Sequence, residues 1–202
     1  MPVKLSSLPT IGSPFEGGFY GGFVRVADEL FAISWAPKAF GETTGRWLDS
    51  YDLVHGSDSC NDSVANTLAM AEAGSPIANW ALGLLIDDHK DWVLPSRDVL
   101  ELAYRHLKPG TYETACSFRD GDNPSSLPSG YPYTEATPIV RTSVAPFQKG
   151  ASEAFEETWY WSSTQYSADT AWIQGFYPGY QGLLVKKDAG RARAVRLIQL
   201  DA

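Results

Sequence analysis

Cysteine is scarce in this chain of 202 residues, which contains two, Cys60 and Cys116. They lie far apart in polar stretches, so they form neither a disulfide framework nor a zinc-ligand pattern. A single bridge is one alternative, and two free thiols are the favoured interpretation.

Long hydrophobic runs are missing as well. No stretch approaches the ~20 apolar residues of a membrane span, and residues 1–10 lack the apolar core of a signal peptide. The sequence therefore predicts a chain with no membrane span that is made in a cytoplasm.

Positive charge is also in short supply. Sixteen Lys and Arg residues against 24 Asp and Glu residues give a formal net charge of −8. A nucleic-acid binder needs a basic footprint that displaces counterions from phosphates, so nucleic acid is excluded as a partner. Five basic residues do gather near the C-terminus, where we expect them on solvated strand faces and edges or against an acidic neighbouring subunit. They are Lys186, Lys187, Arg191, Arg193 and Arg196.

Groups with the spacing of a reaction centre are missing too. The three histidines are scattered, with no metal-ligand spacing between any two of them: His55, His89 and His106. We expect His106 to be a cation at a helix end, where the helix dipole favours positive charge. For Glu153, Glu156 and Glu157, a solvated acidic face is favoured over a glycosidase pair, because spacing alone cannot place two carboxylates across a sugar. The sequence thus predicts a non-enzymatic protein with no catalytic residues and no cofactor.

One short segment carries three oxygen donors close together. Asp120, Asp122 and Asn123 form a set that suits Ca²⁺. The same residue types also stabilise turns by bonding their own backbone. The structural role is the favoured interpretation, and no metal is predicted.

Aromatic residues are plentiful, at 13% of the chain, together with 18 Gly and 13 Pro. This composition is typical of a loop-rich fold whose short strands are held by large rings. Residues 1–14 are expected to form an arm or linker before a single domain over residues 15–202. Two β-rich runs around a short acidic turn predict a hairpin over residues 17–35.

The middle of the chain predicts helices and a long insert. One helix is expected from Ser63 to Ala73. A second begins at Pro76 after a Ser75 cap and has its apolar stripe at Ile77, Trp80, Ala81, Leu84 and Leu85. A further helix is capped by Ser96 and ends before Pro109-Gly110. Residues 110–157 are expected to be a long loop insert.

Four strands are then predicted, over residues 159–164, 171–176, 181–187 and 191–200. The order of elements indicates an α+β fold.

Three motifs in the second half of the chain carry a family resemblance. They are Trp92-Val93-Leu94-Pro95-Ser96-Arg97-Asp98, Trp159-Tyr160-Trp161-Ser162-Ser163-Thr164-Gln165 and Arg193-Ala194-Val195-Arg196. From roughly residue 78 onward this series resembles the Lcl C-terminal-type domains of unknown function, which occur in bacterial surface proteins and bacteriophages. The resemblance implies a C-type-lectin-like fold, in which two helices pack on a small twisted antiparallel sheet and the two termini pair in one sheet. The Trp-Asn-Asp motif of calcium-dependent sugar-binding lectins is not present.

An aromatic stretch with few charges lies between residues 165 and 181. Tyr and Trp beside Gln, Ser and Gly is the composition of recognition surfaces. In a strand, Trp172, Gln174 and Phe176 share one face; they are either exposed or form a small core beneath the insert. The expected binding residues are Tyr166, Trp172, Gln174, Tyr177, Tyr180 and Gln181.

The resemblance implies a function only by analogy. It suggests a non-enzymatic bacteriophage virion protein, at a tail fibre or tail tip, that binds a receptor (protein or glycan) on the host cell and assembles as a homotrimer. The expected location is the virion. The alternative is a structural virion component, a capsid decoration or baseplate protein, anchored to other virion proteins by residues 1–14.

Overall fold

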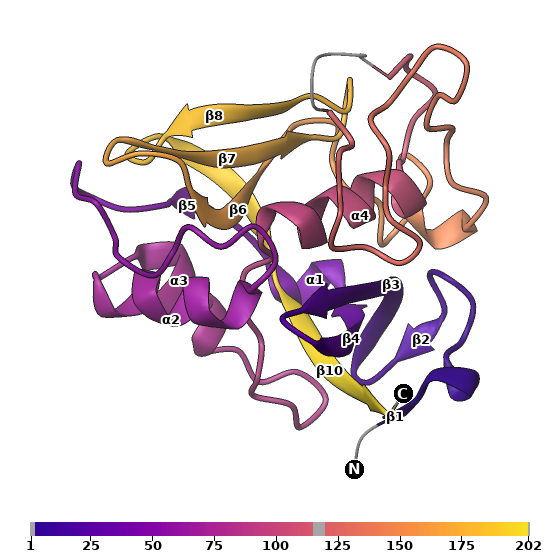
Figure 1. Cartoon of the computed structure of the whole chain (residues 1–202), viewed down its shortest axis with the longest axis horizontal. Coiled ribbons are helices and arrows are strands. Elements are labelled where there is room, and N and C mark those ends of the chain that lie inside the picture. The colour runs from indigo at the N-terminus through magenta and orange to yellow at the C-terminus, as the bar shows by residue number, and fades with distance from the viewer. Residues whose placement is uncertain (1–2, 115–119, 202) are drawn as a thin grey trace.

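A computed structural model describes residues 3–114 and 120–201, and in this part of the chain the strands form two five-stranded sheets. The first sheet has the order β1, β10, β4, β3, β2 and the second has the order β5, β9, β6, β7, β8. Helices lie between and beside the sheets, and both ends of the chain lie together at one side of the molecule (Figure 1). The α+β architecture predicted from the sequence is confirmed.

The first sheet is built around the predicted hairpin. Strands β3 (Gly18–Val26) and β4 (Glu29–Trp35) pair antiparallel, and Ala27 turns the chain at a φ of +51°. The register shifts between Tyr20 and Gly22. Gly21 lies there because a Cβ atom would come within 2.5 Å of the Trp35 ring. Gly21 therefore allows close packing in a bulged strand.

Residues 3–15 pack on this sheet. Strand β1 (Val3–Lys4) runs parallel to β10 (Val195–Asp201), and β2 (Pro14–Phe15) pairs with β3. A 3₁₀ turn over Leu5–Ser7 lies between them, and Leu8 and Ile11 contact a small core around Tyr20 and Leu200. The expected arm is thus bonded to the domain over residues 3–14, because its apolar side chains cover the outer part of the first sheet.

The second sheet contains strands far apart in sequence. They are β5 (Glu42–Arg46), β9 (Ala189–Arg193), β6 (Trp159–Gln165), β7 (Thr170–Gly175) and β8 (Gln181–Val185). The prediction of one strand over residues 191–200 is wrong. The chain leaves the second sheet at Ala194 and enters the first as β10, and Ala194 bonds Gly41 and Ala36 at the crossing. The short helix α1 (Lys38–Gly41) leads directly into β5.

Of the two caps predicted for the longer helices, Ser75 is confirmed and Ser96 is wrong. Asp62 caps α2 (Ser63–Glu72), and Ser75 with Pro76 starts α3 (Pro76–Leu82). α3 ends earlier than its apolar stripe predicts, and Leu85 beyond it is exposed. In α4 (Arg97–Leu107), the Ser96 side chain makes no capping bond.

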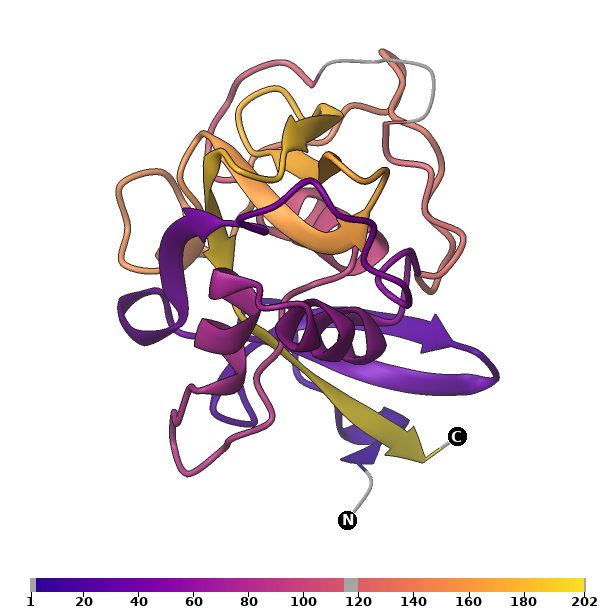
Figure 2. The same ribbon diagram turned by 90° about the vertical axis from the view of Figure 1, so that its left-hand side faces the viewer.

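Both faces of the second sheet are covered. On one face, α2 and α3 enclose a core that includes Trp47, Trp161 and Ile173. On the other, α4 packs between the two sheets over a core that includes Tyr104, Tyr160 and Phe176 (Figures 1 and 2). The described part of the insert, with a 3₁₀ turn over Ala145–Phe147, runs around the outside of α4. Strands covered on both sides expose little beyond their ends and turns, so the candidate site lies at an end of this sheet.

Candidate functional site

The two longest motifs are bonded to each other. The amide of Ser163 donates to the carbonyl of Pro95 over 2.8 Å, and the amide of Arg97 donates to Thr164 Oγ1 over 2.9 Å. Thr164 therefore satisfies an orphan amide at the start of α4, the role predicted for Ser96. The Ser96 amide instead donates to Ser63 Oγ. These motifs stabilise a junction between α4 and β6.

A buried polar network fastens the insert to α4. The Glu101 carboxylate accepts from Tyr133 Oη and Asn123 Nδ2, each over 2.7 Å, and pairs with Arg105 over 2.9 Å. Ser125 Oγ donates to Asp98 Oδ2 over 2.6 Å. Burial raises the pKa of Asp98 to about 6. Fully buried carboxylates with this many protein partners are structural.

The six predicted binding residues do not form one surface. Gln174 and Gln181 are buried, at 1% and 7% exposure, which overturns the prediction for both. Gln174 Nε2 donates to the carbonyl of Gly179 over 2.9 Å. Gln181 Oε1 accepts from the Gly121 amide over 3.3 Å. Phe176 is also buried, in the core under the insert. The insert and α4 cover this strand face, leaving it little contact with solvent.

Tyr166 and Trp172 form a separate pair on the α4 side of β7. Their rings meet edge to face at 5.6 Å, and the Arg97 guanidinium lies 5.3 Å from the Trp172 ring. Tyr166 is exposed and Trp172 is half-buried. This pair lies at the far end of β7 from Tyr177 and Tyr180.

The remaining two residues belong to a second aromatic group, which we call the aromatic ledge: Tyr112, Trp159, Tyr177 and Tyr180. The Tyr112 and Tyr177 rings lie 4.0 Å apart, and the Trp159 and Tyr180 rings meet edge to face at 5.7 Å. All four side chains are exposed, by 37% to 46%. Tyr177 and Tyr180 flank the Pro178-Gly179 turn, which connects β7 to β8.

The ledge rests on glycines that leave room for its rings. A Cβ atom on Gly175 would come within 2.8 Å of the Trp159 ring, and one on Gly182 within 2.3 Å of the Tyr180 ring. The Gly179 amide donates to the carbonyl of Gly175 over 3.1 Å. The rings of Trp159 and Tyr180 therefore pack closely over the backbone at Gly175 and Gly182, which restricts their motion and lowers the entropy lost when a ligand binds them.

The sequence indicated half of this ledge. The composition of the aromatic stretch predicted Tyr177 and Tyr180. Trp159 belongs to a motif, yet the strand pattern does not show that its first residue faces outward. Tyr112 lies in the insert, where no periodic pattern exists. Its pairing with Tyr177 joins residues 65 positions apart, which local sequence does not reveal.

Three ion pairs lie beside the ledge. Lys149 Nζ lies 2.5 Å from Glu157 Oε2 and 5.6 Å from the centre of the Tyr112 ring. Lys38 Nζ lies 2.6 Å from Glu156 Oε1. Arg191 pairs with Glu42 over 2.8 Å. The hydrogen bond from Lys38 lowers the pKa of Glu156, the opposite of what a general acid requires.

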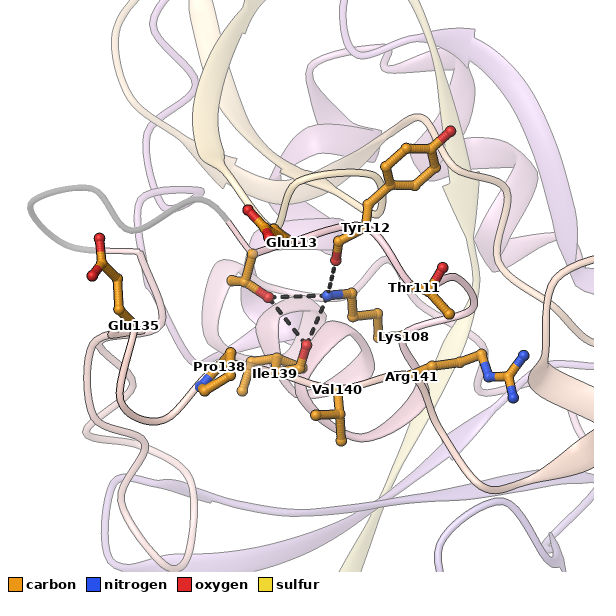
Figure 3. Close-up of a pocket in the computed structure, with 10 residues that line it drawn as sticks. Lys108, Thr111, Tyr112, Glu113, Glu135, Pro138, Ile139, Val140 and Arg141 are labelled. Atoms are coloured by element: carbon orange, nitrogen blue, oxygen red, sulfur yellow. Dashed lines mark hydrogen bonds between the residues drawn. The ribbon is translucent and has the colours of Figure 1, made fainter.

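A cavity of about 550 Å³ opens on the other side of Tyr112 (Figure 3). At its floor, Lys108 Nζ donates to the carbonyl oxygens of Tyr112 and Ile139 over 2.5 and 2.7 Å and to Thr114 Oγ1 over 3.0 Å. Burial lowers the pKa of Lys108. The Tyr112 ring points away from this floor in Figure 3. Since its three donors are used, Lys108 acts as a fastener of the insert and holds the chain that carries Tyr112.

The remaining polar candidates have structural contacts. Asn123 Oδ1 accepts from the Ser126 amide over 3.1 Å, and Asp120 Oδ1 accepts from the Gln181 amide over 3.0 Å. Asp122 contributes its backbone carbonyl to Arg97. Within residues 3–114 and 120–201, no group of three or more His, Cys, Asp or Glu residues is arranged to hold a metal ion. Cys60 is a free thiol, and Cys116 lies outside the described residues.

Two predictions about charged residues are wrong in part. His106 lies in the last turn of α4 as predicted, but it is half-buried with Nδ1 2.8 Å from the carbonyl of Gly21, and burial lowers its pKa, which disfavours the predicted cation. Of the five basic residues near the C-terminus, Lys187 is exposed as predicted, but Lys186, Arg193 and Arg196 are buried and do not lie on solvated strand faces. Arg193 donates to Glu153 and to the carbonyl of Ala36. Arg193 lies in β9 of the second sheet, which is covered on both faces, and alternating charge does not reveal this.

Comparison with models of known protein families gives no match, and no curated protein matches the sequence. None of the helices in the described residues is long and apolar enough to cross a membrane.

Proposed function

We propose that this chain is a non-enzymatic binding protein that attaches a bacteriophage particle, through its tail fibre or tail tip, to a molecule on the host cell surface. The observation that carries the proposal is the aromatic ledge. Four exposed rings on a rigid support concentrate apolar contact area and polar tips in one place, which is typical of binding surfaces. The resemblance to phage and bacterial surface domains supplies the biological setting.

The same proposal includes a C-type-lectin-like fold. Two features support it: the first and last strands, β1 and β10, are neighbours in one sheet, and the second sheet with its long insert lies beyond them. A homotrimer in the virion is part of the proposal by analogy alone.

The alternative is a structural virion component anchored by residues 1–14. Residues 3–15 bond to the domain's own first sheet. An anchor would have to leave those contacts to reach another protein, so the geometry favours attachment through the ledge.

Adsorption of the purified chain to bacteria tests the proposal. Labelled protein should bind cells of susceptible strains, and Tyr177→Ala with Tyr180→Ala should reduce binding at least tenfold while thermal unfolding stays cooperative. Tyr131→Ala is the matched control, because Tyr131 is the most exposed tyrosine outside the ledge. Failure to adsorb to any strain, together with loss of particle assembly on deletion of residues 1–14, would favour the structural alternative.

A further inference from the structure

A groove runs along the ion pairs beside the aromatic ledge. A hollow of about 470 Å³ is lined by Lys149, Glu157, Glu156, Lys38 and Arg191, with backbone of the segment 150–158. A second hollow of about 430 Å³ shares Lys38 and Arg191 with the first and continues to β5. We call the two together the ion-pair groove. Its two hollows in series suit an extended ligand better than a compact one.

The groove is electrically balanced although the chain is strongly acidic. Its three cations pair one to one with three carboxylates: Lys38 with Glu156, Lys149 with Glu157 and Arg191 with Glu42. The chain as a whole carries −8. A balanced groove has no net attraction for an anionic or cationic polymer, because specificity between charged partners depends on opposite potentials.

The ion pairs nevertheless keep hydrogen-bonding capacity. The Lys149 side chain is 62% exposed and that of Glu156 is 47% exposed, so their remaining donors and acceptors face the groove. Paired charged groups hold donors and acceptors side by side at fixed positions. A ligand that has donor and acceptor in the same group, such as a hydroxyl, can bond both members of a pair.

Lys149 joins the groove to the aromatic rings. Its ammonium bonds Glu157 and lies over the Tyr112 ring, which packs against Tyr177. A pyranose ring has an apolar face of C–H groups and a rim of hydroxyl groups. The ledge offers an apolar aromatic surface for that face, and the adjacent ion pairs offer partners for the rim.

We propose that the ion-pair groove, with Tyr112 and Tyr177 at its border, binds an uncharged polysaccharide. One sugar ring packs on the tyrosines, and the hydroxyls of the following sugars bond Glu157, Lys149, Glu156 and Lys38. This inference rests on the proposed attachment function in naming the host surface as the source of the polysaccharide. The binding chemistry itself does not depend on it.

The test uses the full chain on immobilised bacterial polysaccharides, some uncharged and some bearing uronate or sulfate groups, at 50 and 500 mM NaCl. We expect binding to uncharged polysaccharides with less than a twofold change between the two salt concentrations, since a balanced groove has little net charge to screen. Binding restricted to acidic polysaccharides, falling tenfold or more in high salt, would overturn the inference.

Variants locate the site. Glu156→Gln, Lys149→Met and Tyr112→Ala should each weaken binding fivefold or more without loss of cooperative unfolding. Asp49→Asn is the matched control, because Asp49 forms an ion pair with Arg46 in which both side chains are exposed, outside the groove. Equal binding by the three variants and the control would place the polysaccharide elsewhere and overturn the assignment of the groove.

Cells separate this inference from the proposed function. Periodate, which cleaves sugars with vicinal hydroxyls, should abolish adsorption, whereas proteinase K treatment of the cells should leave it intact. The reverse pattern would show a protein receptor: attachment would stand and the polysaccharide would fall. Binding to the immobilised polysaccharide without adsorption to any cells would support the polysaccharide site and overturn the proposed attachment to host cells. Binding to neither would overturn both.

Discussion

The amide of Arg97 and the hydroxyl of Thr164 are joined by a 2.9 Å hydrogen bond between segments 67 residues apart. Thr164 Oγ1 in turn donates to the carbonyl of Ser59 over 2.8 Å. One buried hydroxyl therefore connects the start of α4, the strand β6 and the loop before α2. This relationship gives the two motif segments a physical role in folding, independent of any ligand.

Replacing Thr164 by Val keeps the shape of the side chain and removes both bonds. The Arg97 amide then loses its acceptor and the Ser59 carbonyl loses its donor, both in a buried site. We therefore expect the free energy of unfolding, measured by urea denaturation, to fall by about 2 kcal/mol. Thr44→Val is the control: Thr44 is exposed on β5 of the same sheet, and its change should stay within about 0.5 kcal/mol. Equal effects of the two changes would contradict the role of Thr164.

Asp98 gives a pH-dependent contribution to stability. Burial raises its pKa to about 6, above the usual 3.8, so its contribution is fully present below pH 3.8 and is lost as the pH rises through about 6. The shift corresponds to about 3 kcal/mol. Stability relative to an Asp98→Asn variant should therefore fall between pH 4 and 6.5. Chemical denaturation of both proteins at several pH values measures the difference, and parallel curves would show that Asp98 does not titrate in this range.

Much of the fold follows from local pattern. Short-range rules of turn and helix geometry predict the hairpin around Ala27, the start of α3 at Ser75 and Pro76, and the three strands β6 to β8. The split at Ala194 does not. Residues 191–200 alternate like one strand, and the change of sheet is decided by the bonds of Ala194 to Gly41 and Ala36, which lie more than 150 residues earlier.

The candidate site was harder to predict than the fold. The composition of the aromatic stretch predicted Gln174 and Gln181 as binding residues, which requires that their side chains are exposed. Here α4 and the insert cover the second side, and both side chains bond backbone groups in the interior. Side-chain composition identifies a surface only when the number of covered faces is known.

Arg193 illustrates the same point and gives a prediction about stability. Its guanidinium is fully buried, 2.8 Å from Glu153 Oε2 and 4.7 Å from the centre of the Phe155 ring. Arg193→Met leaves Glu153 without this partner, and we expect a loss of about 3 to 5 kcal/mol. Arg46→Met breaks an exposed pair with Asp49 and should cost at most about 1 kcal/mol. Thermal and urea unfolding of the two variants compare these costs, and a small effect at Arg193 would contradict its burial.

The turn that carries the ledge can be tested at Gly179. This residue has a φ of +78°, and a Cβ atom there would lie 2.5 to 2.7 Å from the Tyr104 ring. Gly179→Ala therefore combines backbone strain of about 1 kcal/mol with steric overlap of about 1 to 3 kcal/mol against a buried ring. The turn should shift and carry Tyr177 and Tyr180 with it.

Gly74→Ala separates the two effects. Gly74 has a φ of +86° and no atom within 4 Å of its Cβ position, so the variant has the strain without the overlap. We expect Gly179→Ala to be the less stable of the two by about 2 kcal/mol and to lose adsorption to cells, while Gly74→Ala binds like the unaltered protein. Because both changes add one methyl group at a left-handed glycine, a difference in binding reports on the position of the ledge. If Gly179→Ala loses stability as expected but keeps full binding, the ligand does not contact Tyr177 and Tyr180, and the ledge is not the binding surface.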